Sequence, residues 1–147
     1  MIHVRDVVKG RPVVTVEKVA TVQTAVEIMA REHVGILAVM EKGLLVGVFS
    51  ERDVISRVVA KQFEPVRTSV GSVMTRNIVI AQADDTIDDC LRKMKKADCR
   101  HLPVVEGDVL LGMLSLRDVL QVEVTEKEDR IEFLQSYMFH LPPSEQQ

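Results

Sequence analysis

The strongest constraint on the fold is an internal repeat at a spacing of 65 residues. Residues 13–55 align with residues 78–120 without a gap, and 12 of the 43 aligned pairs are identical. The most similar stretches are GVFSERDVI at 47–55 and GMLSLRDVL at 112–120. A repeat of this length predicts two copies of one supersecondary unit, because each copy needs the other to bury its apolar surface.

Each copy shows the same succession of predicted elements. A short β-rich run, RPVVTV or NIVIA, comes first. A helix follows, because apolar residues recur with the spacing of one helical face: Val22, Ala25, Val26 and Met29 in the first copy, and Ile87, Cys90, Leu91 and Met94 in the second. Two apolar runs joined by a short glycine-containing link then predict a β-hairpin. A second helix is expected to begin at Ser50 or Ser115, and in the first copy it carries Val54, Ile55 and Val58.

The repeat predicts an α+β fold made of two β-α-β-β-α units. One unit of about 50 residues is too small to bury both its sheet and its helices, so the two units are expected to pack face to face. The expected limits are residues 1–62 and 63–125 for the units and 126–147 for a C-terminal helix and tail. Between the units, SVGSVMT at 69–75 is expected to form a helical turn, matched by RDVVKG at 5–10.

Charge and composition limit the classes of partner. The net charge of −3 and the sequence pI near 5.8 argue against nucleic acid, because its phosphates are usually met by clustered Lys and Arg. No stretch approaches the roughly 18 consecutive apolar residues of a membrane span, and MIHVRDVVKG lacks the apolar core of a signal peptide. We therefore expect a cytoplasmic protein without a membrane partner. Cys90 and Cys99 match neither a disulfide framework nor a metal-site spacing, so no metal is expected.

Ser50 and Asp53, like Ser115 and Asp118, stand where a predicted strand meets a helix. One interpretation is a capping box, in which serine accepts a backbone N–H and the acid reaches back to another. The other is a nucleotide site, in which the helix N-terminus and the arginine of the motif bind phosphate and the aspartate accepts from a ribose diol. The glycine that opens each motif would permit close approach of the ligand. The residues alone leave both interpretations open.

Three features together resemble a known family: the duplicated units, the motifs GVFSERD and GMLSLRD, and the stretch RHLPVVEGDVLLG. The chain resembles a tandem pair of cystathionine-β-synthase (CBS) domains. The resemblance covers roughly residues 1–125. It implies a Bateman module, in which two units related by pseudo-twofold symmetry form two clefts between them. Such clefts bind adenosine derivatives such as AMP, ADP, ATP, NAD or S-adenosylmethionine, and such modules usually regulate another protein.

The resemblance also implies which residues line the clefts. It places Asp118 and Asp53 on ribose hydroxyls. Near the phosphates it places Ser115, Arg117, Ser50 and Arg52. Apolar contacts to adenine are expected from Val14, Val34, Gly35 and Met113 in the cleft of Asp118, and from Val79, Cys99 and Val48 in the cleft of Asp53.

The two clefts are expected to differ at one position of the repeat. Gly35-Ile36 in the first copy corresponds to Arg100-His101 in the second. Basic residues at this place in the family often contact phosphate, so Arg100 and His101 join the predicted site. Tighter phosphate-dependent binding is expected in the cleft that contains Arg100. The alternative is that both residues only lie in solvent at the start of a strand and contact no ligand.

The segment after residue 125 predicts a helix with two apolar stripes. One stripe contains Ile131, Leu134 and Met138, and the other contains Phe133, Tyr137 and His140, before Pro142-Pro143 ends the helix. A helix that is apolar on more than one side is expected to pack across the module or onto a second subunit. We therefore expect a homodimer, with the last few residues disordered.

These features predict a regulatory module that binds an adenine nucleotide, AMP or ATP, and modulates a partner protein that the sequence does not identify. One alternative is a sensor of NAD or NADH, because the Ser-Arg-Asp motif does not separate a mononucleotide from half of a dinucleotide. Another is a structural module in which the motifs are only caps. An enzyme is not expected, because the clusters that offer catalytic groups are those assigned to the ligand.

Overall fold

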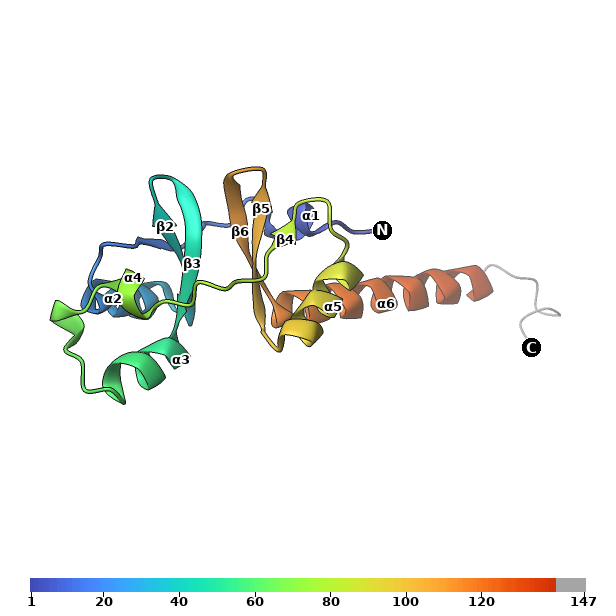
Figure 1. Cartoon of the computed structure of the whole chain (residues 1–147). Coiled ribbons are helices and arrows are strands. Elements are labelled where there is room, and N and C mark those ends of the chain that lie inside the picture. The colour runs from blue at the N-terminus through green and yellow to red at the C-terminus, as the bar shows by residue number, and fades with distance from the viewer. Residues whose placement is uncertain (140–147) are drawn as a thin grey trace.

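The computed structural model describes residues 1–139 and contains two similar assemblies of strands and helices (Figure 1). The first part of the chain forms α1 (Val4–Val8), β1 (Thr15–Glu17), α2 (Val22–Glu32), β2 (Ile36–Glu41), β3 (Leu44–Ser50), α3 (Glu51–Asp53) and the π-helix η1 (Val54–Val59). After the short 3-10 helix η2 (Pro65–Arg67), the second part forms α4 (Val70–Val73), β4 (Ala81–Gln82), α5 (Ile87–Ala97), β5 (His101–Glu106), β6 (Val109–Ser115) and α6 (Leu116–Phe139). This order confirms the predicted α+β fold with two repeats.

Each unit builds a three-stranded sheet with the same topology. The strand orders are β1-β2-β3 and β4-β5-β6. In both sheets the first strand runs parallel to the second, and the second runs antiparallel to the third. Ile36 pairs with Ser50 and His101 pairs with Ser115, so each motif serine lies beside the entrance of the preceding strand. Strands β3 and β6 lie next to each other at the centre of the molecule (Figure 1).

Helices α2 and α5 follow the sequence prediction closely. Thr21 caps α2, since its hydroxyl oxygen accepts from the N–H of Thr24 at 3.1 Å, and Thr86 forms a reciprocal capping box with Asp89 at the start of α5. The buried side chains are Val22, Ala25 and Met29 in α2 and Ile87, Cys90 and Met94 in α5. The predicted apolar faces are therefore confirmed at these six positions.

The short helix before each sheet packs into the core of the other unit: α1 joins the core of the second sheet, and α4 joins the core of the first. Val4 of α1 is buried in the core of the second sheet, whereas Val70 of α4 is buried in the core of the first. Backbone hydrogen bonds hold both turns in place: the N–H of Val4 donates to the carbonyl of Asp85 at 2.9 Å, and the N–H of Val70 donates to the carbonyl of Ala20 at 2.8 Å. Each core therefore contains residues from both sides of the predicted limit at residues 62 and 63.

The glycine of each motif allows this exchanged packing. A Cβ added to Gly47 would lie 2.6 Å from the carbonyl oxygen of Thr75, and one added to Gly112 would lie 3.0 Å from Cβ of Val8. The missing side chain is therefore needed where a strand meets the exchanged segment. The expectation that these glycines admit a ligand is corrected, because protein atoms occupy the space that they leave.

Three elements differ from the sequence prediction. The first strand of the second unit is only Ala81–Gln82, at the end of the predicted NIVIA run. The second helix of the first unit continues from α3 as a π-helix, which leaves Ile55 exposed while Val58 is buried. The second helix of the second unit, α6, runs without a break to Phe139 and so crosses residue 125. No glycine or proline interrupts 116–139 to separate two helices.

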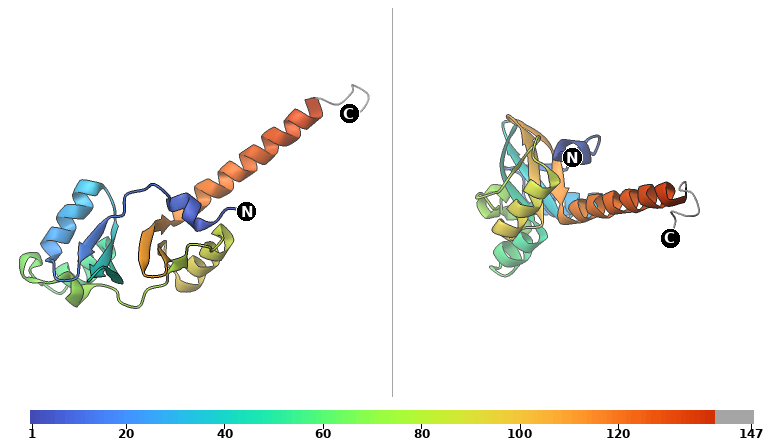
Figure 2. Two further views of the ribbon diagram at one scale, coloured as in Figure 1. Left: turned by 90° about the horizontal axis from the view of Figure 1, so that it is seen from above. Right: turned by 90° about the vertical axis from the view of Figure 1, so that its right-hand side faces the viewer.

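The C-terminal part of α6 projects away from both sheets (Figure 2). Among its described side chains, Ile131, Phe133, Leu134 and Met138 are all more than half exposed. Of the two expected arrangements, packing of these residues across the module is not observed, because the helix leaves the module before it reaches them, and packing onto a second subunit stays a prediction. His140, Pro142-Pro143 and the disorder expected at the end of the chain lie outside the described residues. Within residues 1–139, no helix has the length and apolarity that crossing a membrane requires.

Candidate functional site

Two open cavities lie where the two units meet, and each contains one motif aspartate. The cavity at Asp118 has a volume of about 820 Å³, and the cavity at Asp53 has a volume of about 630 Å³. Both are built from both repeats: Val34 of the first unit lines the cavity of Asp118, and Val79 of the second lines that of Asp53. We call them the Asp118 cleft and the Asp53 cleft.

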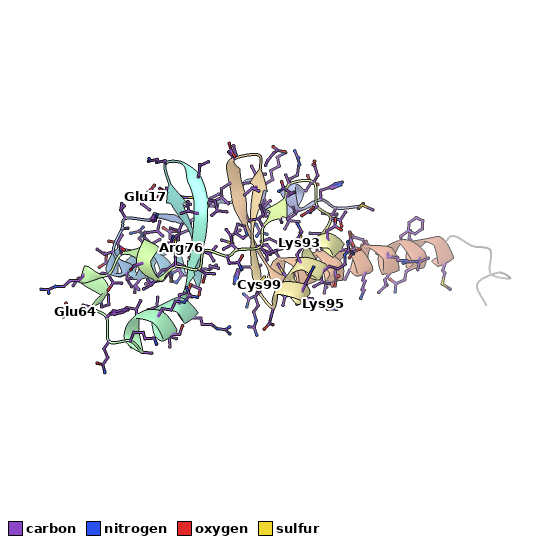
Figure 3. All side chains as sticks on the ribbon, in the orientation of Figure 1. Glu17, Glu64, Arg76, Lys93, Lys95 and Cys99 are labelled. Carbon is purple, nitrogen blue, oxygen red and sulfur yellow. The ribbon has the colours of Figure 1, made fainter. Side chains whose placement is uncertain are left out.

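Every predicted site residue lines at least one cleft. The Asp118 cleft contains Val14, Val34, Gly35, Arg100, His101, Met113, Ser115, Arg117 and Asp118. The Asp53 cleft contains Gly35, Val48, Ser50, Arg52, Asp53, Val79, Cys99, Arg100 and His101. Figure 3 labels Cys99, which lies between α5 and β5. Arg100 lines both clefts, so its position does not assign phosphate binding to one of them. The roles of these residues toward a ligand remain predictions.

The capping interpretation is correct for both motifs. The N–H of Ser115 donates to Oδ2 of Asp118 at 2.8 Å, and the N–H of Asp118 donates to Oγ of Ser115 at 3.1 Å. Ser50 and Asp53 form the same pair of bonds, at 3.0 and 3.2 Å. These caps fix each aspartate in the lining of its cleft. A cap and a binding site are therefore compatible, because each cap uses only part of the carboxylate.

The N–H groups at these helix starts are largely used within the protein. Besides the two caps, the carbonyl of Gly35 accepts from the N–H of Glu51 at 3.0 Å, and the carbonyl of Arg100 accepts from that of Leu116 at 2.8 Å. Few N–H groups at these helix starts therefore remain free to bind phosphate, contrary to the expectation from the sequence. Binding of phosphate in either cleft would depend mainly on side chains.

Asp118 retains an oxygen for a further partner. Its Oδ2 accepts from Ser115 and lies 2.9 Å from Nη1 of Arg11. Within residues 1–139, its Oδ1 has no hydrogen-bond or ion-pair partner. The side chain is 18% exposed and faces the larger cleft. This carboxylate can therefore accept hydrogen bonds from a ligand without losing its cap.

Asp53 is more fully used by the protein. The hydroxyl of Thr75 lies 3.3 Å from both of its carboxylate oxygens, and Nε of Arg57 lies 3.6 Å from Oδ1. Its side chain is only 9% exposed. Arg57 is itself held by the carbonyl of Met74, to which its Nη1 donates at 2.8 Å. The two clefts are therefore unequal, and Asp118 is the more available acceptor.

The electrostatics of the Asp118 cleft are set by two opposing effects. Burial raises the pKa of the Asp118 carboxyl, but hydrogen bonds from Arg11 and Ser115 lower it below its ordinary value. The carboxylate is therefore ionised at neutral pH. Burial lowers the pKa of His101 below its ordinary value, with Arg100 acting in the same direction and Asp118 opposing both. His101 therefore offers a neutral ring, and positive charge for phosphate comes from the arginines.

Sequence reasoning missed three residues that contact the aspartates. They are Arg11 in the Asp118 cleft and Arg57 and Thr75 in the Asp53 cleft. Arg11 had a usable signal, because Arg11 and Arg76 are separated by the repeat spacing of 65 residues. Arg76, labelled in Figure 3, instead donates to the carbonyl of Gly71 at 3.0 Å. The equivalent arginines thus make different contacts in the two units.

The sequence profile of the CBS domain matches residues 4–60 and 70–124. The chain belongs to the CBS domain family. The matched segments begin at the first residues of α1 and α4. Each CBS domain, as the family defines it, therefore starts with the helical turn that packs into the core of the other.

A curated relative is the Meiotically up-regulated gene 70 protein of Schizosaccharomyces pombe. It is 39% identical over 118 residues, and the match covers 79% of this chain and 16% of that protein. The chain spans less than a quarter of the length of the first curated relatives that it matches.

Solved CBS structures share the fold. A CBS-domain protein from Burkholderia ambifaria has a TM-score of 0.78 and 28% identity, with 84% of this chain and 95% of that chain covered. A CBS domain protein from Pyrobaculum aerophilum, solved in complex with AMP, has a TM-score of 0.73 and 26% identity, with 80% and 89% covered. These similarities confirm the predicted pair of CBS repeats.

Proposed function

We propose that the chain is a regulatory module that binds an adenosine nucleotide, AMP or ATP, in the Asp118 cleft. The observation that carries the proposal is the free Oδ1 of Asp118, which lines a cleft of about 820 Å³. Ligand pockets commonly have volumes of about 300–1,000 Å³. The complex of the Pyrobaculum aerophilum relative with AMP supports the same class of ligand.

The lining of the Asp118 cleft suits the three parts of a nucleotide. Val14, Val34 and Met113 offer apolar contacts to adenine, and Asp118 offers an acceptor to the ribose hydroxyls. Arg11, Arg100 and Arg117 surround the same cleft and supply charge for phosphate. Arg11 is paired with Asp118. Nucleotide binding would therefore have to share or replace this ion pair.

Regulation is favoured over catalysis by the way the cleft uses its reactive groups. Ser115 and His101 pair across β5 and β6, but within residues 1–139 no hydrogen bond joins the serine hydroxyl to the imidazole. The hydroxyl oxygen instead accepts from the cap N–H. A nucleophile needs an adjacent base to activate it. The proposal therefore includes modulation of a separate partner protein. It also includes a homodimer, formed through the exposed apolar surface of the module.

NAD or NADH is a second candidate, favoured by the adjacency of the clefts. Gly35, Ile36, Arg100 and His101 line both of them. A dinucleotide with its adenosine half at Asp118 would therefore find further polar and apolar lining next to its phosphates.

A ligand panel tests the proposed function. Thermal unfolding would be followed with AMP, ATP, NAD, NADH and S-adenosylmethionine, and copurified nucleotide would be identified by mass spectrometry. We expect AMP or ATP to stabilise the protein by about 2.7 kcal/mol at a hundred times its dissociation constant. A larger effect of NAD or NADH would support the second candidate. If no adenosine derivative raises the unfolding temperature, the motifs are only caps and the proposal fails.

Replacing Arg11 with alanine should separate phosphate recognition from ribose recognition. The change removes a cation from the phosphate side and also frees Asp118 from its ion pair. We expect affinity for AMP to fall by about tenfold, the equivalent of about 1.4 kcal/mol, while affinity for adenosine stays equal or rises. Isothermal titration calorimetry measures both.

Arg76→Ala is the matched control, since Arg76 is the repeat equivalent and its Nη2 is held by the carbonyl of Gly71. Equal weakening of AMP and adenosine in Arg11→Ala would show that Arg11 acts through folding rather than through phosphate.

A further inference from the structure

Helix α6 carries an apolar seam with the spacing of a coiled coil. The seam residues are Leu120, Val124, Lys127, Ile131, Leu134 and Met138. Their separations alternate between four and three residues, which is the a/d pattern of a heptad repeat. The five apolar members are between 48% and 55% exposed. An apolar stripe of this kind, interrupted here only by Lys127, is typical of a helix that packs against another helix.

The chain's own module leaves the C-terminal part of this seam, from Ile131 onward, uncovered. Nearer the module, Leu120 and Val124 line the Asp118 cleft, and Lys127 lines a cavity that also contains Met1 and Asp88. The face of α6 that packs on the module contains Val119, which is buried, and Val122, which is partly buried. At about 100° per residue, the seam lies roughly a third of a turn away from that face. Glu126 and Arg130 still line a cavity with Thr86 at the start of α5, and after this point the helix extends past α5 (Figures 1 and 2). The stability of an isolated helix of this length is marginal in water. The projecting end of α6 would therefore gain stability from packing against a partner.

We propose that α6 pairs with α6 of a second copy as an antiparallel coiled coil, with Ile131 facing Leu134 of the partner subunit. This arrangement deepens the homodimer of the proposed function and does not depend on which nucleotide binds. In this register Lys127, Ile131, Leu134 and Met138 would each lie opposite a seam residue of the partner subunit, whereas Leu120 and Val124 stay at their own Asp118 cleft. The pairing would bury the stripe that the module leaves exposed.

Charge favours the antiparallel orientation over the parallel one. In a parallel pair, Lys127 would meet Lys127 of the partner subunit within the seam, and Glu123 would flank Glu128 of the partner subunit. In the antiparallel register, Lys127 meets Met138 of the partner subunit, and Glu128 flanks Gln135 of the partner subunit. Both like-charge contacts are therefore removed, and the lysine stem can cover the methionine with its ammonium group in water.

This register confines the pairing to the C-terminal half of α6. With Ile131 opposite Leu134 of the partner subunit, residue 126 lies opposite residue 139. The paired segment is then 126–139, which includes the projecting end of α6 (Figure 2) and the turn that lines a cavity with Met1 and Asp88. Residues 116–125 remain with their own core, where Val119 is buried. The two modules would lie at opposite ends of the pair, so close approach of the helices would not force the modules together.

Substitution in the seam tests the interface. We expect Leu134→Glu to raise the dimer dissociation constant by at least about tenfold, measured by sedimentation equilibrium or light scattering of the full chain. Phe133→Glu is the matched control, because Phe133 is 70% exposed and lies off the seam. Unchanged AMP affinity in Leu134→Glu would show that the variant is folded. A dimer that persists in Leu134→Glu overturns the α6 interface while leaving the homodimer intact, and a monomeric unmodified chain overturns both.

Disulfide formation tests the orientation. Lys127→Cys and Met138→Cys are expected to form a mixed disulfide when the two variants are combined under mild oxidation. Neither should crosslink to itself, because equal seam positions would be about 16 Å apart along an antiparallel pair, whereas a disulfide needs Cα atoms within about 7 Å. The unmodified chain controls for Cys99, which is only partly buried. Efficient crosslinking of each variant to itself would show a parallel pair and overturn the proposal.

Discussion

Replacing Asp118 with alanine is expected to weaken AMP binding by about ten- to a hundredfold. The variant loses the acceptor proposed for the ribose hydroxyls, and hydrogen bonds to a charged group contribute about 1.5–3 kcal/mol. The free Oδ1 makes this carboxylate the more available of the two aspartates. Isothermal titration calorimetry with AMP and with adenosine measures the effect, and both ligands should lose affinity because both contain the ribose.

The same substitution also removes one of the two capping-box bonds, the one from the N–H of Ser115, while the bond from the N–H of Asp118 to Ser115 remains. Stability must therefore be measured separately; loss of the cap residue itself would cost about 0.5–2 kcal/mol, so this variant should lose no more than that through the cap and should remain folded at room temperature. Asp53→Ala is the matched control from the other repeat. It should destabilise the fold more strongly, because Asp53 is more buried and contacts Thr75 and Arg57, while binding in the Asp118 cleft is retained. Unchanged AMP affinity in a folded Asp118→Ala protein would mean that Asp118 serves only as a cap.

Both clefts could be predicted from the sequence because their main residues belong to local, repeated patterns. A Ser-x-Arg-Asp stretch at a strand–helix junction places serine and aspartate within one helical turn. The repeat then requires a second junction with the same geometry. Ser115 and Asp118 accordingly form the same cap as Ser50 and Asp53. The assignment of residues to the two clefts came from family resemblance rather than from spacing.

The contacts that distinguish the clefts could not be predicted in the same way. Thr75 reaches Asp53 because α4 packs into the core of the first sheet. Arg11 reaches Asp118 because α1 packs into the core of the second. The packing of α1 and α4 into the opposite cores is a tertiary feature, and the 65-residue repeat does not indicate it. The continuous α6 was missed for a related reason, since the end of the repeat at residue 120 is not the end of a helix.

Gly47→Ala is expected to destabilise the fold by about 1–3 kcal/mol, as overpacked core sites do. The added Cβ would lie 2.6 Å from the backbone oxygen of Thr75 and 2.9 Å from Sδ of Met74. Backbone cannot move as a flexible side chain does, and Met74 is itself buried. The N–H of Val48 donates to the same oxygen at 3.0 Å, so a shift of Thr75 would also strain this bond. Urea unfolding of the ligand-free protein measures the loss.

Gly35→Ala provides the comparison, because its added Cβ would meet only the exposed side chain of Glu51, at 3.2 Å. We expect a clearly smaller loss of stability there. The strain in Gly47→Ala should also reach the Asp53 cleft, since Thr75 contacts Asp53 and Met74 accepts from Arg57. Ligand binding in that cleft should therefore weaken more than binding at Asp118. Equal stability of the two glycine variants would show that the exchanged segment can move away from β3, and that its close packing does not hold the two repeats together.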